Sequence, residues 1–150
     1  MLIVGGGHAG IEAAFALSRM GVKSALITLD KNAIGRLSCN PAIGGLAKSQ
    51  LVKEIDALGG IMGAAADICA IQFKTLNKTK GRAVWATRAQ VDKKKYPLYI
   101  KALIEKNKNI QVVEDEARDI LVKNNKIIGL NLKKLGKIKA RAVVITCGTF

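Results

Sequence analysis

The amino-acid sequence predicts an α/β fold, in which a parallel sheet with helices is combined with an antiparallel β-meander. A short apolar run, Leu2 to Val4, is followed by glycines and then by apolar residues at helical spacing. A second apolar run, Ser24 to Leu29, completes a strand–helix–strand unit of about thirty residues. Towards the end of the chain, strand-like segments alternate with short turns, which is typical of a meander.

The middle of the chain is less regular. Residues 30–47 contain Asn, Gly, Ser and Pro without periodicity, which predicts a long loop of the kind that often carries function. We expect a helix over residues 51–58 and a strand over residues 68–73. Residues 74–88 are expected to be irregular, and residues 89–107 to be helical with a kink or a start at Pro97.

The last third of the chain predicts strands at residues 110–113, 118–122, 126–132 and 137–146. Asn124-Asn125 and Leu135-Gly136 are expected to form the hairpin turns of the meander. No change of composition marks an internal domain boundary. Because the chain begins and ends close to buried strands, we expect residues 1–150 to be the N-terminal fragment of a longer protein.

Charge is concentrated in one part of the chain. The whole sequence has 25 Lys and Arg against 11 Asp and Glu, a net charge of +14. Residues 74–108 hold eleven basic residues and two acidic ones, a net charge of +9. This segment predicts either a nucleic-acid surface or an ordinary lysine-rich solvated surface, and the scarcity of aromatic residues favours the second on composition alone.

Several classes of protein are excluded or disfavoured by composition. No apolar run approaches the roughly 20 residues of a membrane helix, so we expect a soluble, cytoplasmic protein without a membrane partner. The three cysteines contain no C-x-x-C pair, and the chain has one histidine. A disulfide framework and a metal site are therefore not expected.

A glycine motif carries the clearest functional signal. Gly5, Gly7 and Gly10 satisfy the pattern G-x-G-x-x-G between a strand and a helix. The first glycine allows a tight turn, the second lets backbone approach a pyrophosphate, and the third allows close packing of helix and strand. The motif predicts a Rossmann-like dinucleotide site. His8, within the turn, is expected to lie near the cofactor rather than to act as a base.

The acidic residue that usually binds ribose is missing from the end of the second predicted strand. Thr28 occupies that region and Asp30 lies slightly beyond it. Thr28 is either a ribose contact or an ordinary strand residue, and Asp30 could reach the ribose from the loop. In the long loop, Cys39 follows Ser38 and precedes Asn40 and Pro41. A loop thiol near Lys48 and a helix start can act as a nucleophile, although most free cysteines are inert.

Four segments of the chain resemble the N-terminal portion of the GidA/MnmG family of flavoproteins. The resemblance covers residues 2–150 and is carried by the segments Gly5 to Ala14, Ser38 to Gly45, Glu54 to Gly60, and Arg88 to Asp92. The run Ser-Cys-Asn-Pro-Ala-Ile-Gly-Gly is the most specific of them. At residues 80–84 the chain has Arg82 where the family usually has proline.

The resemblance implies that residues 1–150 are the FAD-binding domain of an enzyme that adds a carboxymethylaminomethyl group to the wobble uridine of tRNA. Methylene-tetrahydrofolate would supply the one-carbon unit, NADH the reducing equivalents, and an MnmE-type GTPase would be the partner of a homodimer. Cys39 would be catalytic. The implied FAD contacts are Gly5, Gly6, Gly7, His8, Ala9, Gly10, Thr28, Ala117, Thr146 and Gly148, with Thr149 in the same second flavin motif.

Two alternatives remain open at this point. The first is a folate-dependent tRNA uridine methyltransferase flavoprotein, against which the Ser38 to Pro41 loop argues. The second is a basic, non-redox nucleic-acid-binding module that retains the glycine turn as a scaffold. Flavin absorbance of the purified protein would separate the enzymes from the module.

Overall fold

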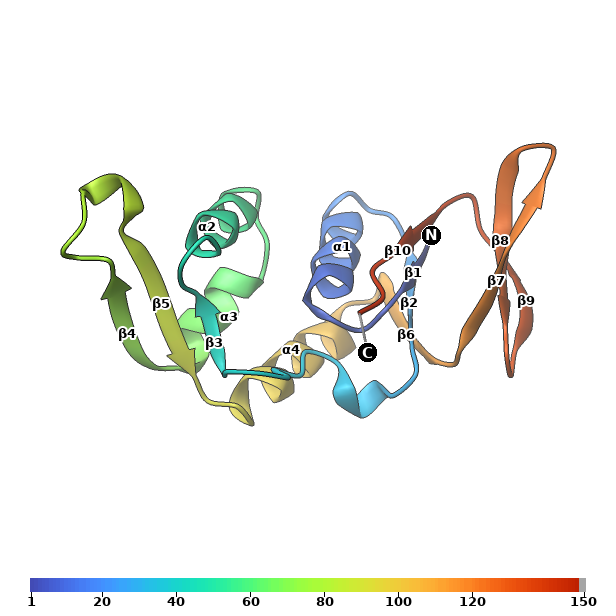
Figure 1. The fold of residues 1–150 in the computed structure, drawn as a ribbon. Helices are drawn as coiled ribbons and strands as arrows, with labels where there is room; N and C mark the ends of the chain where they lie inside the picture. The colour runs from blue at the N-terminus through green and yellow to red at the C-terminus, as the bar shows by residue number, and fades with distance from the viewer. Residues whose placement is uncertain (149–150) are drawn as a thin grey trace. The chain divides into compact units, whose positions relative to one another are not determined.

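The computed structural model describes residues 1–148 and divides the chain into two compact units. Unit 1 comprises Met1–Gly35 together with the chain from Leu103 onward, and unit 2 is Arg36–Ala102 (Figure 1). The amino-acid composition does not indicate this division, because each unit contains its own sheet and helices built from the same residue types. None of the helices in the described part of the chain has the length and apolar character needed to cross a membrane.

Unit 1 contains the predicted parallel sheet. Its strand order is β10-β1-β2-β6, all parallel, and helix α1 links β1 to β2. The elements are β1 (Leu2–Val4), α1 (His8–Arg19), β2 (Ser24–Thr28), β6 (Ile110–Glu114) and β10 (Val143–Ile145). The fold class and the strand–helix–strand unit predicted from the sequence are confirmed.

Both faces of this sheet are covered. Side chains alternate along a strand, so Ile3 and Leu26, both fully buried, point to the face that α1 packs against. Leu2 and Ile27 point the other way and form a core with Leu130. Leu130 comes from the predicted meander, which therefore covers this face of the sheet. The strands of the meander are β7 (Ala117–Lys123), β8 (Lys126–Leu132) and β9 (Gly136–Lys139).

The turns of the meander are where the sequence places them. Asn124 and Asn125 have φ of 50° and 56°, the left-handed backbone that a two-residue hairpin turn requires. Gly136 has φ of 68° at the second turn. The expected single strand over residues 137–146 is wrong, because the chain leaves β9 at Lys139 and enters the other sheet as β10.

A buried carboxylate holds the meander to β6. Asp115 is 3% exposed, and its oxygens accept hydrogen bonds from the N–H groups of Glu116, Lys134 and Leu135 at 2.7–3.1 Å. Burial alone raises the pKa of Asp115, but the N–H donors, Leu135 foremost, and the charge of Lys134 outweigh it and lower the pKa from its ordinary 3.8.

Replacing Asp115 by asparagine is expected to lower the melting temperature at neutral pH. The amide brings an N–H₂ group towards backbone donors, so bonds that the carboxylate accepts are lost. Because the folded-state pKa is lowered, the carboxylate stabilises the fold above about pH 4 and loses this effect as the pH falls through the folded-state pKa. Thermal unfolding from pH 7 to pH 3 should be less pH-dependent in Asp115→Asn, and an unchanged profile would contradict this role.

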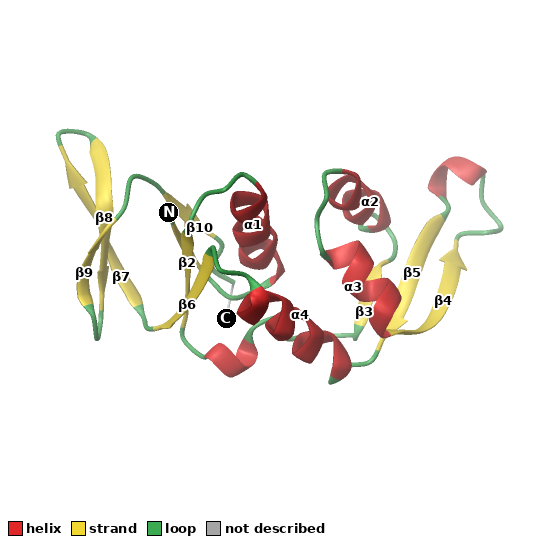
Figure 2. Cartoon of the chain, turned by 180° about the vertical axis from the view of Figure 1, so that it is seen from behind, coloured by secondary structure: helices red, strands yellow, loops and turns green. Residues whose placement is uncertain are grey.

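Unit 2 is built on an antiparallel sheet with strand order β3-β5-β4. Helices α2 and α3 contact β3 and β5, on the face of the sheet that carries Ile43 and Ala89 (Figure 2). The elements are β3 (Ala42–Gly44), α2 (Ser49–Ala57), α3 (Met62–Cys69), β4 (Ala70–Leu76) and β5 (Ala86–Val91). The helix expected over residues 51–58 is present.

Several expectations for this unit are wrong. Residues 74–88 are not irregular: they contain the end of β4, the 3₁₀ turn η2 (Arg82–Val84) and half of β5. Residues 89–91 belong to strand β5, and the helix α4 (Lys95–Lys106) begins at Lys95. The side chain of Asp92 stabilises this helix start by accepting hydrogen bonds from the N–H groups of Lys94 and Lys95. Pro97 lies in the first turn of α4, where its missing N–H costs nothing. Residues 30–47 contain η1 (Lys31–Ala33) and β3.

Candidate functional site

The glycine turn of unit 1 is shaped by close backbone contacts. Gly5 has φ of +112°, which side chains rarely adopt, and its N–H donates to the carbonyl of Ile27 at 2.8 Å. A Cβ on Gly5 would collide with the carbonyl oxygen of Thr146. A Cβ on Gly10 would collide with the carbonyl oxygen of Gly5 and lie 2.7 Å from Thr146 Oγ1. Packing alone therefore requires glycine at positions 5 and 10.

Gly7 differs from these two glycines. Its backbone is extended, with φ of −77° and ψ of 180°, and a Cβ at this position would meet nothing within 4 Å. The protein's own packing therefore does not require glycine here. Gly7 leaves its backbone open at the N-terminus of α1, where N–H groups without helical acceptors and the helix dipole favour an anion. The first turn of α1 carries no acidic residue.

Thr146 ties the end of β10 to this turn. Its Oγ1 donates to the carbonyl of Val4 at 2.8 Å and to that of Gly5 at 3.3 Å, and its N–H donates to Val4 at 2.9 Å. The sequence placed Thr146 in a flavin motif, and the structure brings it to the base of the glycine turn. Gly148 is exposed, and Thr149 lies outside the described residues.

The two residues between Gly7 and Gly10 have different surroundings. Ala9 is exposed, and His8 is half-buried in the first turn of α1. Burial lowers the pKa of His8 from its ordinary 6.5, so its imidazole is neutral at pH 7. A neutral imidazole adds no charge of its own to the anion-binding end of the helix.

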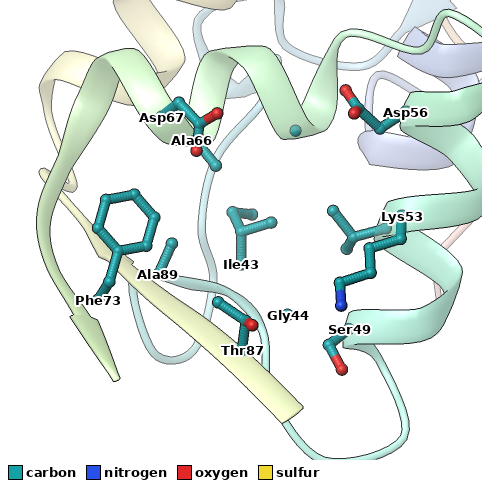
Figure 3. A pocket seen from close by; sticks show the side chains of 12 residues that line it. Ile43, Gly44, Ser49, Lys53, Asp56, Ala66, Asp67, Phe73, Thr87 and Ala89 are labelled. Atoms are coloured by element: carbon teal, nitrogen blue, oxygen red, sulfur yellow. The ribbon is translucent and has the colours of Figure 1, made fainter. Parts of the chain in front are cut away.

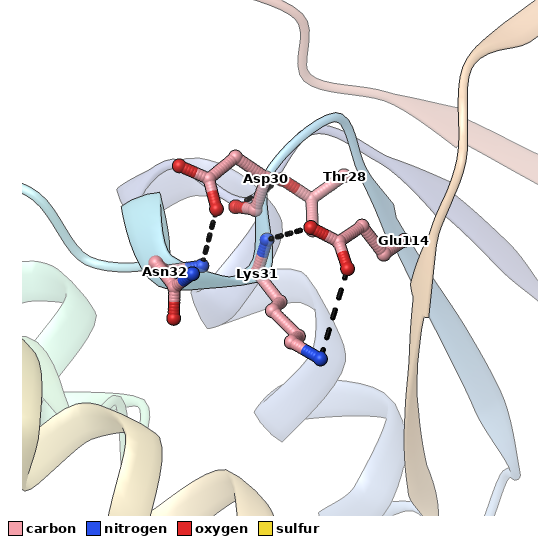
Figure 4. A network of polar contacts seen from close by, with 5 residues as sticks. All are labelled: Thr28, Asp30, Lys31, Asn32 and Glu114. Atoms are coloured by element: carbon pink, nitrogen blue, oxygen red, sulfur yellow. Dashed lines mark hydrogen bonds and ion pairs between the residues drawn. The ribbon is translucent and has the colours of Figure 1, made fainter.

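Thr28 lies next to the glycine turn, at the carboxyl end of β2. A Cβ on Gly6 would lie 2.9 Å from Thr28 Oγ1 and 3.1 Å from Ile34 Cγ1. The Thr28 hydroxyl donates to the carbonyl of Asp30 at 3.2 Å, and the Asp30 side chain accepts from the N–H of Asn32 at 2.7 Å (Figure 4). Thr28 therefore fixes the path of the chain as it leaves β2.

Glu114 is a residue at this edge that the sequence analysis missed. It ends β6 and pairs with Thr28 in the sheet register. Its Oε1 accepts from the Lys31 N–H at 3.4 Å, and its Oε2 lies 3.7 Å from Lys31 Nζ. The available signal was its place directly after the third parallel strand, because the carboxyl ends of parallel strands share one edge.

Ala117 opens β7 and packs with Val4 against the core of unit 1. It lines a pocket of about 210 Å³ together with Val4, Ile145 and Cys147. The structure thus brings Ala117 beside the strands that lead into the glycine turn and into Thr146. In unit 1, the residues that sequence predicted for a dinucleotide gather at the carboxyl edge of one sheet.

Replacing Gly10 by alanine is expected to destabilise the protein by about 3 kcal/mol, since the added methyl group would overlap backbone that cannot move away cheaply. Gly7→Ala is the matched control, because its methyl group meets nothing within 4 Å. Urea unfolding followed by circular dichroism measures both variants. Equal free energies of unfolding for the two variants would show that position 10 tolerates a methyl group and does not require glycine.

Cys39 belongs to unit 2, whereas the glycine turn belongs to unit 1. Its thiol is exposed and lines a pocket of about 330 Å³ whose other lining residues include Asn40, Lys48 and Arg88. Lys48 directly precedes α2, close to the helix start that the sequence predicted. Arg88 comes from β5 and begins the segment Arg88 to Asp92 that carries the resemblance, although the sequence assigned no role to its side chain.

A second pocket of about 180 Å³ lies on the opposite face of the unit 2 sheet. Ile43, Phe73 and Ala89 form its apolar floor, and Lys53 and Asp56 of α2 stand at its rim (Figure 3). Some of its lining residues, such as Ile43 and Asp56, belong to segments that carry the resemblance, but the sequence assigned a site role to none of them. Among residues 1–148, the structure shows no cluster of three or more His, Cys, Asp or Glu side chains that could hold a metal ion.

The glycine turn fits a dinucleotide. An anionic diphosphate can approach the backbone at Gly7 without meeting a side chain, and the N-terminus of α1 supplies the favourable dipole. The parallel sheet supplies the carboxyl edge at which ligands of such folds bind.

Comparison with known proteins supports the same fold. The solved structure of Aquifex aeolicus GidA superposes with a TM-score of 0.94 at 52% identity, covering 99% of this chain and 25% of that one. A GidA-related protein from Thermus thermophilus matches with a TM-score of 0.64 at 19% identity, covering 99% of this chain and 52% of that one, which shows the fold alone. The fold is of the Rossmann-like type.

Curated relatives match this chain over its full length. A tRNA uridine 5-carboxymethylaminomethyl modification enzyme MnmG from Aquifex aeolicus is 52% identical over 150 residues, and its namesake from Campylobacter fetus is 50% identical over 150 residues. The chain spans 24% of the length of each of these relatives. The family model described as glucose inhibited division protein A matches residues 1–150, and this chain therefore belongs to the GidA family.

Proposed function

We propose that this chain is the N-terminal, FAD-binding part of a longer flavoprotein that adds a carboxymethylaminomethyl group to the wobble uridine of tRNA. The observation that carries the proposal is the open backbone at Gly7. Packing requires glycine at positions 5 and 10, but it does not require glycine at position 7. Its support comes from relatives about half identical over the whole chain that carry this activity in their names.

The residues of unit 1 would divide the binding of FAD among them. The backbone from Gly5 to Gly10 and the N-terminus of α1 would hold the diphosphate. Thr28 and the chain at Asp30 would lie towards the ribose, and the backbone at Ala117 towards the adenine. Thr146 would keep the turn in shape through its bonds to Val4 and Gly5.

Bound FAD would supply the redox chemistry, and the protein would supply binding and orientation. Cys39 is proposed to act on the uridine, either as a nucleophile or as a proton carrier, from its pocket with Lys48 and Arg88. Methylene-tetrahydrofolate is the proposed one-carbon donor and NADH the proposed reductant. The complete enzyme is proposed to be a cytoplasmic homodimer that works with an MnmE-type GTPase.

The activity is tested in cells that lack their own enzyme of this type. The longer protein containing this chain is expressed, total tRNA is digested, and the wobble nucleosides are measured by mass spectrometry. We expect the carboxymethylaminomethyl nucleoside to appear. The appearance of 5-methyluridine instead would favour the folate-dependent methyltransferase, and RNA binding by a colourless protein would favour a non-redox module.

A further inference from the structure

Strand pairing in unit 2 builds a row of residues along the pocket of Cys39. The register places Gly44, Arg88 and Lys74 side by side across β3, β5 and β4. Paired residues project from the same face of a sheet. Gly44 and Arg88 line the Cys39 pocket, so Lys74 lies next to it on the same face.

This row places positive charges close together. Arg88 and Lys74 stand directly opposite each other, and like charges in that position destabilise a sheet. Within residues 1–148, neither side chain is within ion-pair distance of a carboxylate. Arg88 Nη2 donates a long hydrogen bond of 3.5 Å to Gln90 Oε1. A guanidinium has five N–H donors in a planar fork that matches a phosphate group.

The pocket leaves room for an anion next to Arg88. Gly44 has no side chain beside the guanidinium, and its φ of +82° together with the carbonyl of Thr87 excludes one. Lys48 adds another positive charge to the lining, and none of the lining residues is acidic. The cavity of about 330 Å³ thus combines basic side chains with the thiol of Cys39.

The positive charge continues past the pocket. Lys78, Lys80 and Arg82 follow Lys74 along the chain, and residues 68–91 include no Asp or Glu. The Arg82 guanidinium lies 5.8 Å from the centroid of the Trp85 ring, and this tryptophan is 41% exposed. Several cations close in sequence, one of them beside an exposed aromatic ring, suit a single-stranded RNA, whose phosphates need neutralising and whose bases stack on such rings. A small anion would occupy only the Cys39 pocket and would not use the further cations or the tryptophan.

We infer that this surface binds the backbone of a single-stranded RNA loop and that Arg88 and Lys48 hold the phosphate of the nucleotide presented to Cys39. The surface, called here the basic face, consists of Lys48, Lys74, Lys78, Lys80, Arg82, Trp85 and Arg88. The inference rests on the proposed function in taking the RNA to be the anticodon loop of a tRNA.

The test is fluorescence anisotropy of a labelled anticodon stem-loop RNA titrated with the protein at several salt concentrations. The variant is the double substitution Arg88→Gln with Lys74→Gln. Two lost phosphate contacts on a single strand should lower the slope of log affinity against log salt by about 1.4. The matched control is Lys123→Gln with Lys126→Gln, an exposed lysine pair that is also opposite across strands but lines no pocket of unit 2. Its slope should equal that of the unchanged protein.

Arg88→Lys separates charge from the shape of the guanidinium. It should keep the slope, because the charge remains, and bind the RNA more weakly than the unchanged protein. An unchanged slope in the double variant, no RNA binding by the unchanged protein, or equally good competition by polyglutamate would each overturn the inference. Flavin absorbance of the same samples and the nucleoside assay report separately on the proposed function, so the inference can fail while the function stands.

Discussion

Replacing Gly7 by valine is expected to abolish FAD binding while leaving the fold and its stability unchanged. The side chain would enter space that is empty in the protein, because a Cβ at Gly7 meets nothing within 4 Å. It would occupy the path by which a diphosphate reaches the backbone at the start of α1. We expect affinity to fall by roughly 100-fold or more, about 2.7 kcal/mol. Flavin absorbance of the purified protein and its melting temperature measure the two effects.

Gly81→Val is the matched control for this prediction. Gly81 also has open space at its Cβ position and a φ of −58° that any residue adopts, but it lies in unit 2 before η2. This variant should keep both flavin and stability. If Gly7→Val retains its flavin in a folded protein, the diphosphate does not pass Gly7.

Replacing Cys39 by serine in the longer flavoprotein is expected to eliminate the modified wobble nucleoside while FAD and tRNA remain bound. A hydroxyl is a far poorer nucleophile than a thiol, and the loss of a proton carrier alone would slow the reaction roughly 100- to 10,000-fold. The thiol is exposed in its pocket beside Lys48 and Arg88, so the serine should not disturb packing. Nucleoside mass spectrometry measures the product.

The other cysteines provide the controls. Cys147 is exposed, and Cys147→Ala should keep full activity. Cys69 is 1% exposed, and burial raises the pKa of its thiol, which leaves it in the unreactive form. Cys69→Ser should keep activity to the extent that the protein folds. Normal product from Cys39→Ala would end the catalytic assignment of Cys39.

The sequence predicted unit 1 well because local signals and packing agree there. Apolar runs, turn glycines and helical spacing identify β1, α1, β2 and the meander without any knowledge of distant contacts. The sequence also predicted the roles of Gly5 and Gly10. It did not predict that Thr146 contributes a close contact that excludes a side chain at each of these positions. Thr146 follows Gly5 by more than a hundred residues, and its contacts with the turn depend on the parallel pairing of β1 with β10.

Unit 2 was predicted less well for a physical reason. In β5 the buried residues are Ala86, Ala89 and Val91, and this spacing is not the period-2 alternation of a half-buried strand. In β4 the apolar Ile71 and Phe73 are exposed, so neither strand has a clear pattern of burial in its sequence. The strand β3 has only three residues, too few for a periodic signal. The placement of Arg88 opposite Lys74 follows from the register of the hairpin, which spacing along the chain does not reveal.

Unit 1 is proposed to bind the ADP half of FAD at the glycine turn. The most direct test is competition: the protein is saturated with FAD, and the displacement of flavin by ADP or by FMN is followed through flavin fluorescence. ADP should displace FAD, because it carries the diphosphate, ribose and adenine that the turn, Thr28 and Ala117 would hold. FMN, which lacks them, should not. Displacement by FMN with no effect of ADP would contradict binding of the ADP half at the glycine turn.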